Sequence, residues 1–485
     1  MFFKLRQTAI QAKIHFFILS LIVIGIVCSK FLMSLGMMLG GLNLLIAADF
    51  KNNFLELKRN SFFGLIFGFY LLHLLGMLWT DDLSHGFDDL RVKASLIAIP
   101  LIICSKPLPK LKFVRNLFLV FILALIFTSV FNFISYNFYR AELDINDIRG
   151  LSRFGSHIRY GILIALGLPI LLELYSNFPK WKYLFLIVGL WFLFYTFYSQ
   201  VLSGIIAVLI VVFGTVFWRL HFSKKYALAI GLISVSIGLI TCTFLYLMRP
   251  IHYVERYQPN YISLKETWNK MAEIPYDSLD IRKQKLSQTL ERYLLSKKLP
   301  VSGDGVLKLS KQDIRNIEAG FADINETQSG FMARLYSVRY EIHNASDPNG
   351  HSILERIEYW KTGWEVIKEN PFFGVGTGDK NNAMQEMFIK KNSKLFPERR
   401  LRPHNSYLTF CLTFGFFGLF FFCYFLFKFL LFQLKNQQFI GFLFITVTLI
   451  TFIFEDSLET QMGVTFFAFF FAFFSRKIEA EELNT

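Results

Sequence analysis

The sequence is poor in cysteine and in acidic residues. None of the cysteines is placed to form a disulfide in the long polar segment 249–403, because all five lie in or beside apolar runs: Cys28, Cys104, Cys242, Cys411 and Cys423. The sequence shows no metal-binding or redox motif. It has 36 acidic residues against 51 basic ones, and the apolar runs contain almost none of the acidic residues. This scarcity disfavours a transporter, which usually carries paired ionisable residues or broken helices at mid-membrane.

Apolar residues are abundant instead. Hydrophobic residues make up 54% of the 485 residues, 58 residues are Phe, and the mean hydropathy is +0.42. This composition excludes a soluble globular protein of this size. Runs of roughly 16 to 25 apolar residues match the ~30 Å hydrocarbon core of a bilayer. We therefore expect an all-α integral membrane protein with about twelve transmembrane helices, near residues 14–33, 34–49, 62–80, 92–104, 114–136, 159–176, 181–199, 201–217, 226–247, 405–427, 437–454 and 461–475.

Three of these apolar runs differ from the others. The runs at 34–49 and 92–104 are short or interrupted by Gly and Pro, so either of them could be re-entrant rather than spanning. The first run follows a basic N-terminal stretch but has no small-residue cleavage site. We therefore expect it to be retained as the first helix.

Basic residues in the short connections predict the orientation. With a cytoplasmic N-terminus, 19 Lys and Arg fall in the cytoplasmic connections and 7 in those of the opposite side, which places both termini inside. The other 25 basic residues lie in 249–403, and segments this long cross the membrane regardless of charge. The net charge of +15 is then mainly a topology signal, and we expect no nucleic-acid partner.

This pattern divides the chain into three parts. We expect an N-terminal bundle of about nine helices over 1–248, a large and mostly helical outer loop over 249–403, and about three C-terminal helices over 404–485. Within the loop, 262–298 has the pattern of a charged helix and 299–330 that of a turn-rich connection.

An amphipathic helix is predicted at 352–369. Ser352 and Glu355 have the spacing of a capping box, and apolar residues including Trp360 and Trp364 recur at helical spacing. The tryptophans suit the headgroup layer of a membrane. The sequence after this helix, 374–380, is rich in glycine but lacks the Walker A spacing, so we expect no nucleotide. We favour a tight turn there over direct phosphate contact.

The most informative segment begins at His404. A titratable ring and the amide of Asn405 precede an apolar run just after the longest polar stretch, which places candidate chemistry at a membrane surface. On a continuous helix advancing ~100° per residue, His404, Gly415 and Gly418 share one face, and the two glycines allow another helix to pack closely beneath the histidine. The alternative is that His404 is only a polar cap.

Several basic residues near the predicted outer surface form a second group. Arginine keeps its charge in a partly dry site, and its rigid fork of donors suits phosphate oxygens. Most outer arginines are expected only to be solvated or to bind anionic headgroups. The positions of Arg153, Arg159 and Arg356, beside predicted membrane entries or on the amphipathic helix, favour phosphate binding for these three. The candidates are Arg153, His157, Arg159, Arg339, Arg356 and Arg402.

These motifs resemble those of the O-antigen ligases and related bacterial polysaccharide polymerases. The resemblance rests on His404-Asn405 followed by Gly415 and Gly418 at the outer end of a span, on the stretch from Arg356 through the glycine turn, and on Gly155-Ser156-His157-Ile158-Arg159-Tyr160. The architecture of about twelve spans with one large late loop also fits. The turn at 199–204 lacks an arginine that many members carry, and we assign it no role.

The resemblance implies a metal-independent, inverting glycosyltransferase without cofactor in the bacterial inner membrane. Its donor would be a glycan on undecaprenyl pyrophosphate and its acceptor a lipid A core sugar, both presented by membrane lipids. His404 would be the general base, while Arg159 and Arg356 would stabilise the pyrophosphate leaving group. Substrate-binding roles would fall to Asn405, Arg153, His157, Arg339 and Arg402.

Three other functions compete with the ligase. An O-antigen polymerase, or an oligosaccharyltransferase that glycosylates Ser or Thr of a protein, would use the same donor and differ in its acceptor. A lipid-linked glycan transporter is the non-enzyme alternative.

Overall fold

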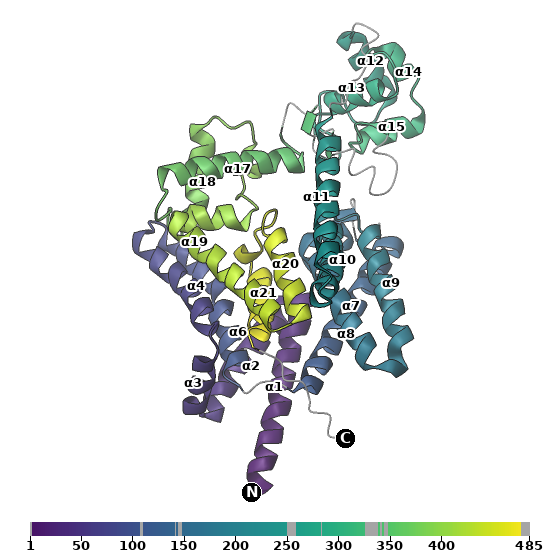
Figure 1. Ribbon diagram of the computed structural model, residues 1–485. Helices are drawn as coiled ribbons and strands as arrows, with labels where there is room; N and C mark the ends of the chain where they lie inside the picture. The colour runs from purple at the N-terminus through teal and green to yellow at the C-terminus, as the bar shows by residue number, and fades with distance from the viewer. Residues whose placement is uncertain are drawn as a thin grey trace. The chain divides into compact units, whose positions relative to one another are not determined.

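The structure is a computed structural model that describes residues 2–106, 110–140, 142–143, 148–249, 259–282, 284–324, 338–339, 342–343 and 348–476. The described residues form helices and no named strand, which confirms the all-α fold class (Figure 1). The chain divides into two compact units. The first contains 1–229, 362–387 and 402–485, and the second contains 230–361 and 388–401. The predicted three-part division stays a prediction, although residues 362–387 of the predicted loop cluster with the first unit.

Eight of the described helices are long and apolar enough to cross a membrane, so the protein is a multi-pass membrane protein. These helices agree with the predicted runs to within a few residues at most ends. They are α1 (Phe2–Cys28), α2 (Lys30–Ala47), α7 (Leu111–Phe138), α8 (His157–Asn177), α9 (Lys182–Tyr198), α10 (Leu202–Phe222), α11 (Tyr226–Met248) and α19 (Ser406–Lys435). A ninth span is counted if α3 (Phe50–Arg59) and α4 (Phe63–Leu75), with the 3₁₀ turn Gly76–Trp79, form one bent span.

Among the described residues, eight helices, or nine with the bent pair, pass this test of length and composition, against the expected number of about twelve spans. Three predicted runs form short helices instead: α6 (Ser95–Cys104), α20 (Phe439–Thr451) and α21 (Gln461–Phe474). At 1.5 Å per residue, even the 14 residues of α21 extend only ~21 Å, less than the hydrocarbon core of ~30 Å. Apolar helices of this length are more often buried inside a protein.

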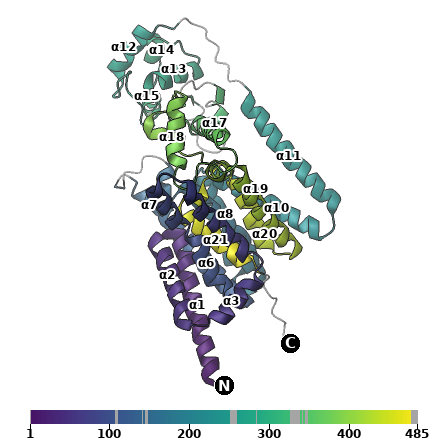
Figure 2. The same ribbon diagram turned by 90° about the vertical axis from the view of Figure 1, so that its left-hand side faces the viewer.

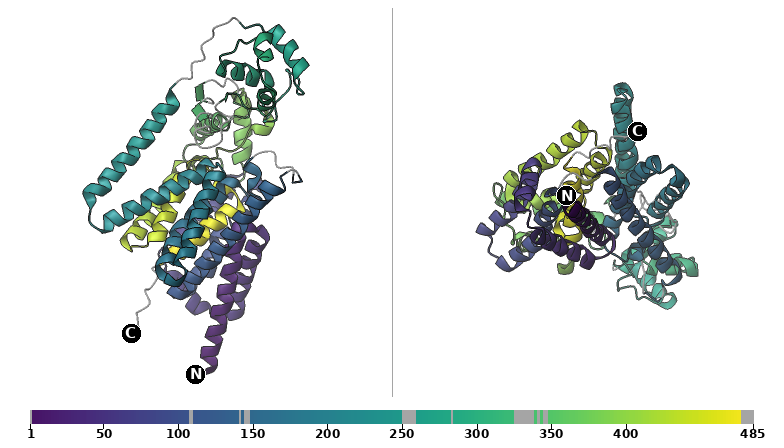
Figure 3. Two further views of the ribbon diagram at one scale, coloured as in Figure 1. Left: turned by 90° about the vertical axis from the view of Figure 1, so that its right-hand side faces the viewer. Right: turned by 90° about the horizontal axis from the view of Figure 1, so that it is seen from below.

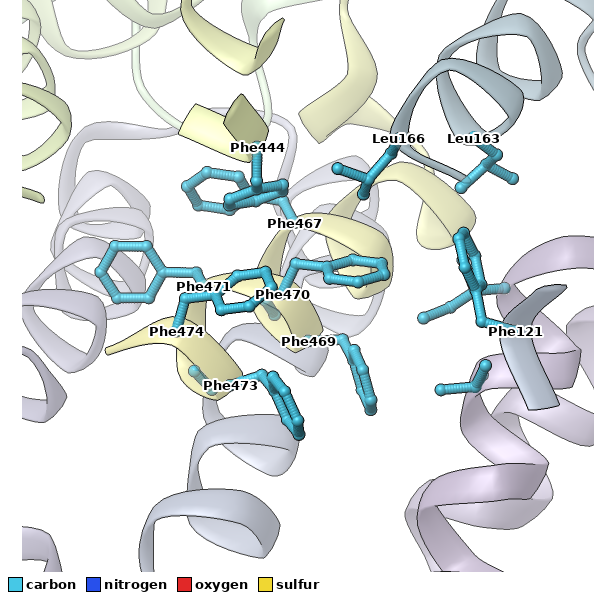
Figure 4. Packing of buried hydrophobic residues seen from close by; sticks show 14 of the residues in the cluster. Phe121, Leu163, Leu166, Phe444, Phe467, Phe469, Phe470, Phe471, Phe473 and Phe474 are labelled. Atoms are coloured by element: carbon cyan, nitrogen blue, oxygen red, sulfur yellow. The ribbon is translucent and has the colours of Figure 1, made fainter. Parts of the chain in front are cut away.

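The helix α21 is buried in this way. Every residue from Phe467 to Phe474 is buried, and its rings pack against α6, α19 and α20. The centroids of Phe471 and Phe429 lie 4.2 Å apart in a stacked pair. Figure 4 shows this aromatic layer, with Leu163 and Leu166 of α8 and Phe121 of α7 facing it. The high phenylalanine content thus builds a protein core as well as a lipid-facing surface.

The first two helices form a hairpin with almost no loop (Figure 2). Ser29 interrupts the run with extended backbone, and its hydroxyl accepts a hydrogen bond from the N–H of Leu32, so it caps α2. A Cβ at Gly25 would lie 2.3 Å from the backbone nitrogen of Met33, so only glycine allows this closeness. The boundary expected between 33 and 34 therefore falls at residue 29.

Helices α7, α9 and α10 all pack against α8, as the blue and teal helices of Figure 3 show. The contact between α8 and α10 is closest at two glycines. A Cβ on Gly161 would lie 2.8 Å from the Cα of Gly204. Small residues at such a crossing let the backbones approach and increase van der Waals contact.

The second unit contains a small helical lobe with its own apolar core, centred on Trp268, Leu290 and Tyr293. Its helices are α12 (Tyr261–Met271), α13 (Leu286–Ser296), α14 (Gly303–Leu307) and α15 (Lys311–Glu318). The single charged helix expected over 262–298 is thus two helices, and Pro275 lies between them, where it disfavours a continuous helix.

The predicted amphipathic helix is present as α17 (Ser352–Glu369), followed by α18 (Lys380–Lys390). Both helices cross the boundary between the two units. In the second unit, the carboxylate of Glu355 accepts a hydrogen bond from the N–H of Gly350 and forms an ion pair with Arg399 at 2.5 Å.

Candidate functional site

His404 lies just before α19 and not within it. Its backbone has a φ of +50°, a left-handed conformation that non-glycine residues rarely adopt. Two neighbours hold this backbone in place: the N–H of His404 donates to Oδ2 of Asp456 at 3.0 Å, and Asn405 caps α19 by accepting from the N–H of Leu408 at 3.0 Å. The carbonyl oxygen of the Asn405 side chain is therefore engaged in the cap. Its predicted role in substrate binding stays a prediction.

The expected shared face of His404, Gly415 and Gly418 is wrong. Helix α19 is broken at Gly415, where φ is +65° and ψ is −168°. The prediction assumed a continuous helix with 100° per residue, and this assumption does not hold across the break. Because a Cβ at Gly415 would lie 2.2 Å from the carbonyl oxygen of Phe372, the glycine permits close packing against a loop and not against another helix. A Cβ at Gly418 would meet Phe414, which belongs to the same helix.

The glycine turn at 374–378 fills this break. The carbonyls of Leu412 and Thr413, which lose helical partners at the break, accept hydrogen bonds from the N–H groups of Val375 and Gly376 at 3.0 Å each. The next two N–H groups of the turn donate to the carbonyl of Gly76 and the hydroxyl of Thr80. These N–H groups are occupied by protein acceptors, which agrees with a tight turn and not with phosphate contact.

An acidic loop lies next to His404 and was not predicted from the sequence. The segment 455–459 lies between α20 and α21 and contributes Glu455, Asp456 and Glu459. Glu455 and Asp456 are buried, and the side chain of Glu459 is 8% exposed. Besides the N–H of His404, Asp456 accepts a hydrogen bond from the hydroxyl of Thr409 at 2.8 Å. The backbone carbonyl of Glu455 accepts from Ser406 at 2.7 Å. A signal was available, because three carboxylates between two apolar runs are unusual in so basic a chain.

Glu459 is the centre of a buried ion network. Its Oε1 lies 3.0 Å from Nζ of Lys93, and its Oε2 contacts Lys380 and lies 3.2 Å from Nη1 of Arg402. Asp89 adds a second carboxylate, 2.6 Å from Lys93 and 2.7 Å from Lys380. Lys93 and Lys380 are buried, while Arg402 is about one third exposed. The network therefore joins α5 (Leu83–Lys93), the start of α18 and the segment before α19.

Burial and charge shift the pKa values of these groups. Burial raises the pKa of Asp456 to about 6, and the charges of Glu459 and Glu455 act in the same direction against Arg402 and the hydrogen bond from Thr409. Burial acts in the same sense on Glu459, but Lys380, Lys93 and Arg402 hold its pKa well below the usual range. Glu459 is thus a fixed negative charge, and Asp456 changes its charge near neutral pH.

Arg159 lies in the first turn of α8 and lines a cavity. Hydroxyl groups of Ser156, Thr451 and Ser457 share the lining with it, and the other walls are mostly apolar side chains of α1, α8 and α21, among them Val27, Leu163, Met462 and Phe467. The Nε–H of Arg159 is buried and makes no hydrogen bond within the described residues. Electrostatic interactions link Arg159 to Glu455 and to Arg402. Arg159 and Arg402 therefore lie in the same region as the acidic loop, and this loop contacts the backbone of His404.

The other candidates lie elsewhere. His157 lines a second, smaller cavity with Ser152, Tyr195 and Ser199. Arg153 is exposed, and its backbone N–H donates to Asn132 at 3.1 Å. These two residues are close to Arg159 in sequence but do not line its cavity.

Arg356 and Arg339 belong to the second unit. The Nε of Arg339 donates to the carbonyl of Arg249 at 2.6 Å, and its guanidinium lies 5.1 Å from the ring centroid of Tyr246. Arg356 is half-buried on α17. Their predicted contacts with substrate stay predictions.

The fold and the site define the class: a multi-pass, all-helical membrane protein with a histidine and arginines gathered beside an acidic loop. Residues 184–423 match the sequence model of a family described as O-antigen ligase. The chain belongs to the O-antigen ligase superfamily. Membership implies ligase- or polymerase-like activity and a glycosyltransferase-like enzyme. No curated protein matches the chain. The matched range includes His404, Arg356 and Arg402 but neither Arg159 nor the acidic loop.

Proposed function

We propose that the protein transfers a glycan from undecaprenyl pyrophosphate to a lipid A core sugar at the periplasmic face of the bacterial inner membrane. The observation that supports this most is the cavity with apolar walls that Arg159 lines, together with the electrostatic interactions of Arg159 with Arg402 and with the acidic loop that holds the backbone of His404. A guanidinium with an unused donor suits a diphosphate, and apolar walls suit the isoprenoid units attached to it.

In the proposed reaction His404 is the general base. It takes the proton of an acceptor hydroxyl while that oxygen attacks the anomeric carbon of the donor glycan. The bond from this carbon to the phosphate oxygen breaks at the same time, and the electron pair leaves with the pyrophosphate. Because the attack comes from the face opposite the leaving group, the anomeric configuration inverts.

The cations near His404 stabilise the leaving group in this proposal, without a metal ion. The two phosphates gather negative charge as the bond breaks. Arg159 presents fixed positive charge at the cavity, and Arg402 is close enough to interact electrostatically with it. Glu459 keeps Arg402 in place through its ion pair at 3.2 Å. Arg356 is retained as a further candidate for the diphosphate.

The test is a deletion strain complemented with wild-type protein or with His404→Ala. We expect the variant to insert in the membrane but to lose about 10²- to 10⁴-fold in transfer, because the base is absent. Gels that display both lipopolysaccharide and polyprenyl-linked glycan then separate the possibilities. A ligase defect leaves long chains on the carrier, whereas a polymerase defect leaves core bearing at most one repeat.

Two further results would redirect the proposal. Normal surface polysaccharide in the His404→Ala strain would exclude the base role. Unchanged lipopolysaccharide together with unglycosylated envelope proteins would indicate transfer to protein. The matched control is His221→Gln, which changes a histidine near the end of α10 that has no role in the proposal.

A further inference from the structure

The short helix α3 meets α4 at an unusual angle. Its ten residues, Phe50–Arg59, are followed by a break, and the next helical segment, Phe63–Trp79, is bent from it by 95°. Figure 1 shows α3 turning away from the beginning of α4. At 1.5 Å per residue α3 is ~15 Å long, half the thickness of a hydrocarbon core.

Polar side chains attach α3 and the residue after it to the rest of the first unit. The amide of Asn60 donates to Oγ of Ser475 at 2.7 Å and to Sγ of Cys104 at 3.1 Å. Glu56 forms an ion pair with Arg476 at 2.5 Å. Asn53 is buried and accepts from Lys106 at 3.5 Å. The docked side of α3 therefore holds these polar groups, together with Leu57, which packs against the apolar core.

The free side of α3 combines apolar and basic residues. Phe50 is 60% exposed, Phe54 67% and Leu55 44%. At ~100° per residue, Lys51 and Lys58 fall on the same exposed arc, between Phe54 and Leu55. Both lysines are exposed.

This arrangement is the reverse of an amphipathic helix on a water-facing surface, which buries its apolar stripe and exposes its polar one. Two exposed phenylalanines flanked by lysines match a helix that lies in the plane of a membrane interface. The rings enter the boundary of the acyl chains, and the long lysine side chains reach the headgroups. Charged residues at 51, 58 and 59 also disfavour placing α3 deep in the bilayer.

We propose that α3 lies in the plane of the bilayer interface and binds anionic phospholipid headgroups through Lys51 and Lys58. The positive charge of the free face indicates that the partner is an anionic lipid. The free face, which runs around the helix from Phe50 to Leu55, carries two cations and no carboxylate. Glu56 lies on the docked side, where it pairs with Arg476, and Asp49 precedes the helix. Each basic side chain near an anionic membrane surface strengthens binding about fivefold.

Hydrogen exchange of the full-length protein in nanodiscs tests this assignment without any substitution. One set of discs contains phosphatidylcholine alone, and the other contains about one third phosphatidylglycerol. We expect the backbone amides of 50–59 to exchange roughly tenfold more slowly in the anionic discs, since headgroup binding opposes local opening of the helix. The amides of the lobe helix α13 serve as an internal reference and should not respond.

A pair of double variants then tests the residues. Lys51→Gln with Lys58→Gln should abolish most of the difference between the two lipids. Lys308→Gln with Lys311→Gln removes the same charge from exposed positions in the lobe, and this control should keep the difference. If the first variant does not fold, Phe54→Ser takes its place and should raise exchange of 50–59 in both lipids.

Two results would overturn the proposal. One is exchange at 50–59 that is the same in neutral and anionic discs. The other is protection that appears only when two copies share a disc, because the free face would then bind a second chain and not lipid. The measurement does not depend on the proposed transferase activity.

Discussion

At the scale of single residues, the site combines a strained backbone with a carboxyl group that titrates near neutral pH. His404 keeps its φ of +50° because Asp456 accepts its N–H on one side and Asn405 starts α19 on the other. Conformations of this kind persist only where the surroundings hold them, and they are frequent at functional sites. Asp456 thus positions the residue proposed as the base.

The raised pKa of Asp456 predicts a pH-dependent stability. The folded pKa of Asp456, about 6, lies above the ordinary value of 3.8. The contribution of Asp456 to the free energy of unfolding is therefore complete below about pH 4 and is lost as the pH rises through 6. The shift corresponds to at most about 3 kcal/mol. Asp456→Asn keeps a neutral side chain at every pH. Between pH 5 and pH 8, we expect Tm to fall less in the variant than in the wild type, and parallel Tm curves would contradict the shift.

The ion network predicts unequal effects for its members. It contains three cations and two carboxylates, so Glu459→Gln leaves three positive charges with only Asp89, whereas Lys380→Met leaves a balanced set. Uncompensated buried charge costs about 3–5 kcal/mol. We expect Glu459→Gln to lower Tm more than Lys380→Met does.

The control for the network is an exposed pair. Lys368 and Glu365 lie 3.1 Å apart on α17 with side chains 55% and 37% exposed. Solvent screens such pairs, so Glu365→Gln should change stability by less than about 1 kcal/mol. Equal Tm values for Glu459→Gln and Glu365→Gln would show that the network does not stabilise the fold.

At the scale of secondary-structure elements, the break in α19 joins the helix to the glycine turn. Gly415→Ala would place a Cβ 2.2 Å from a backbone oxygen and force a positive φ on alanine, so we expect a loss of about 2 kcal/mol or more. Gly189→Ala is the matched control, because a Cβ there meets nothing within 4 Å on α9. Thermal unfolding of both variants in one detergent measures the difference. A Gly415→Ala protein as stable as Gly189→Ala would mean that the turn and helix separate readily.

The sequence predicted most helices but not where they break. Apolar runs are local features, so their lengths gave the positions of α7 to α11 closely. The break at Gly415 depends on acceptors and donors from residues 371–376, which no local pattern at 404–418 reveals. The burial of α21 is not visible in the sequence for the same reason, since it depends on α6, α19 and α20.

At the scale of the whole molecule, the orientation in the membrane is still a prediction from basic residues. We expect alkaline phosphatase fused after residue 260 to be active and the same enzyme fused after residue 224 to be inactive, because the enzyme folds only outside the cytoplasm. The reverse pattern would place His404 on the cytoplasmic side and remove the proposed access to periplasmic substrates. Matched amounts of fusion protein are the control.

The sequence by itself determined the class of the molecule, because hydrophobicity and the spacing of basic residues act on each segment separately. It also led to the prediction that His404, Arg159 and Arg356 act in one site, which stays a prediction. Only the tertiary structure decided that Asp456, Glu459, Lys380 and Lys93 surround that site, as buried charges are stable only beside partners that folding brings from distant parts of the chain. The tertiary structure also decided that α19 is broken at Gly415. The backbone groups left open by the break find hydrogen-bond partners in the glycine turn, which is distant in the sequence.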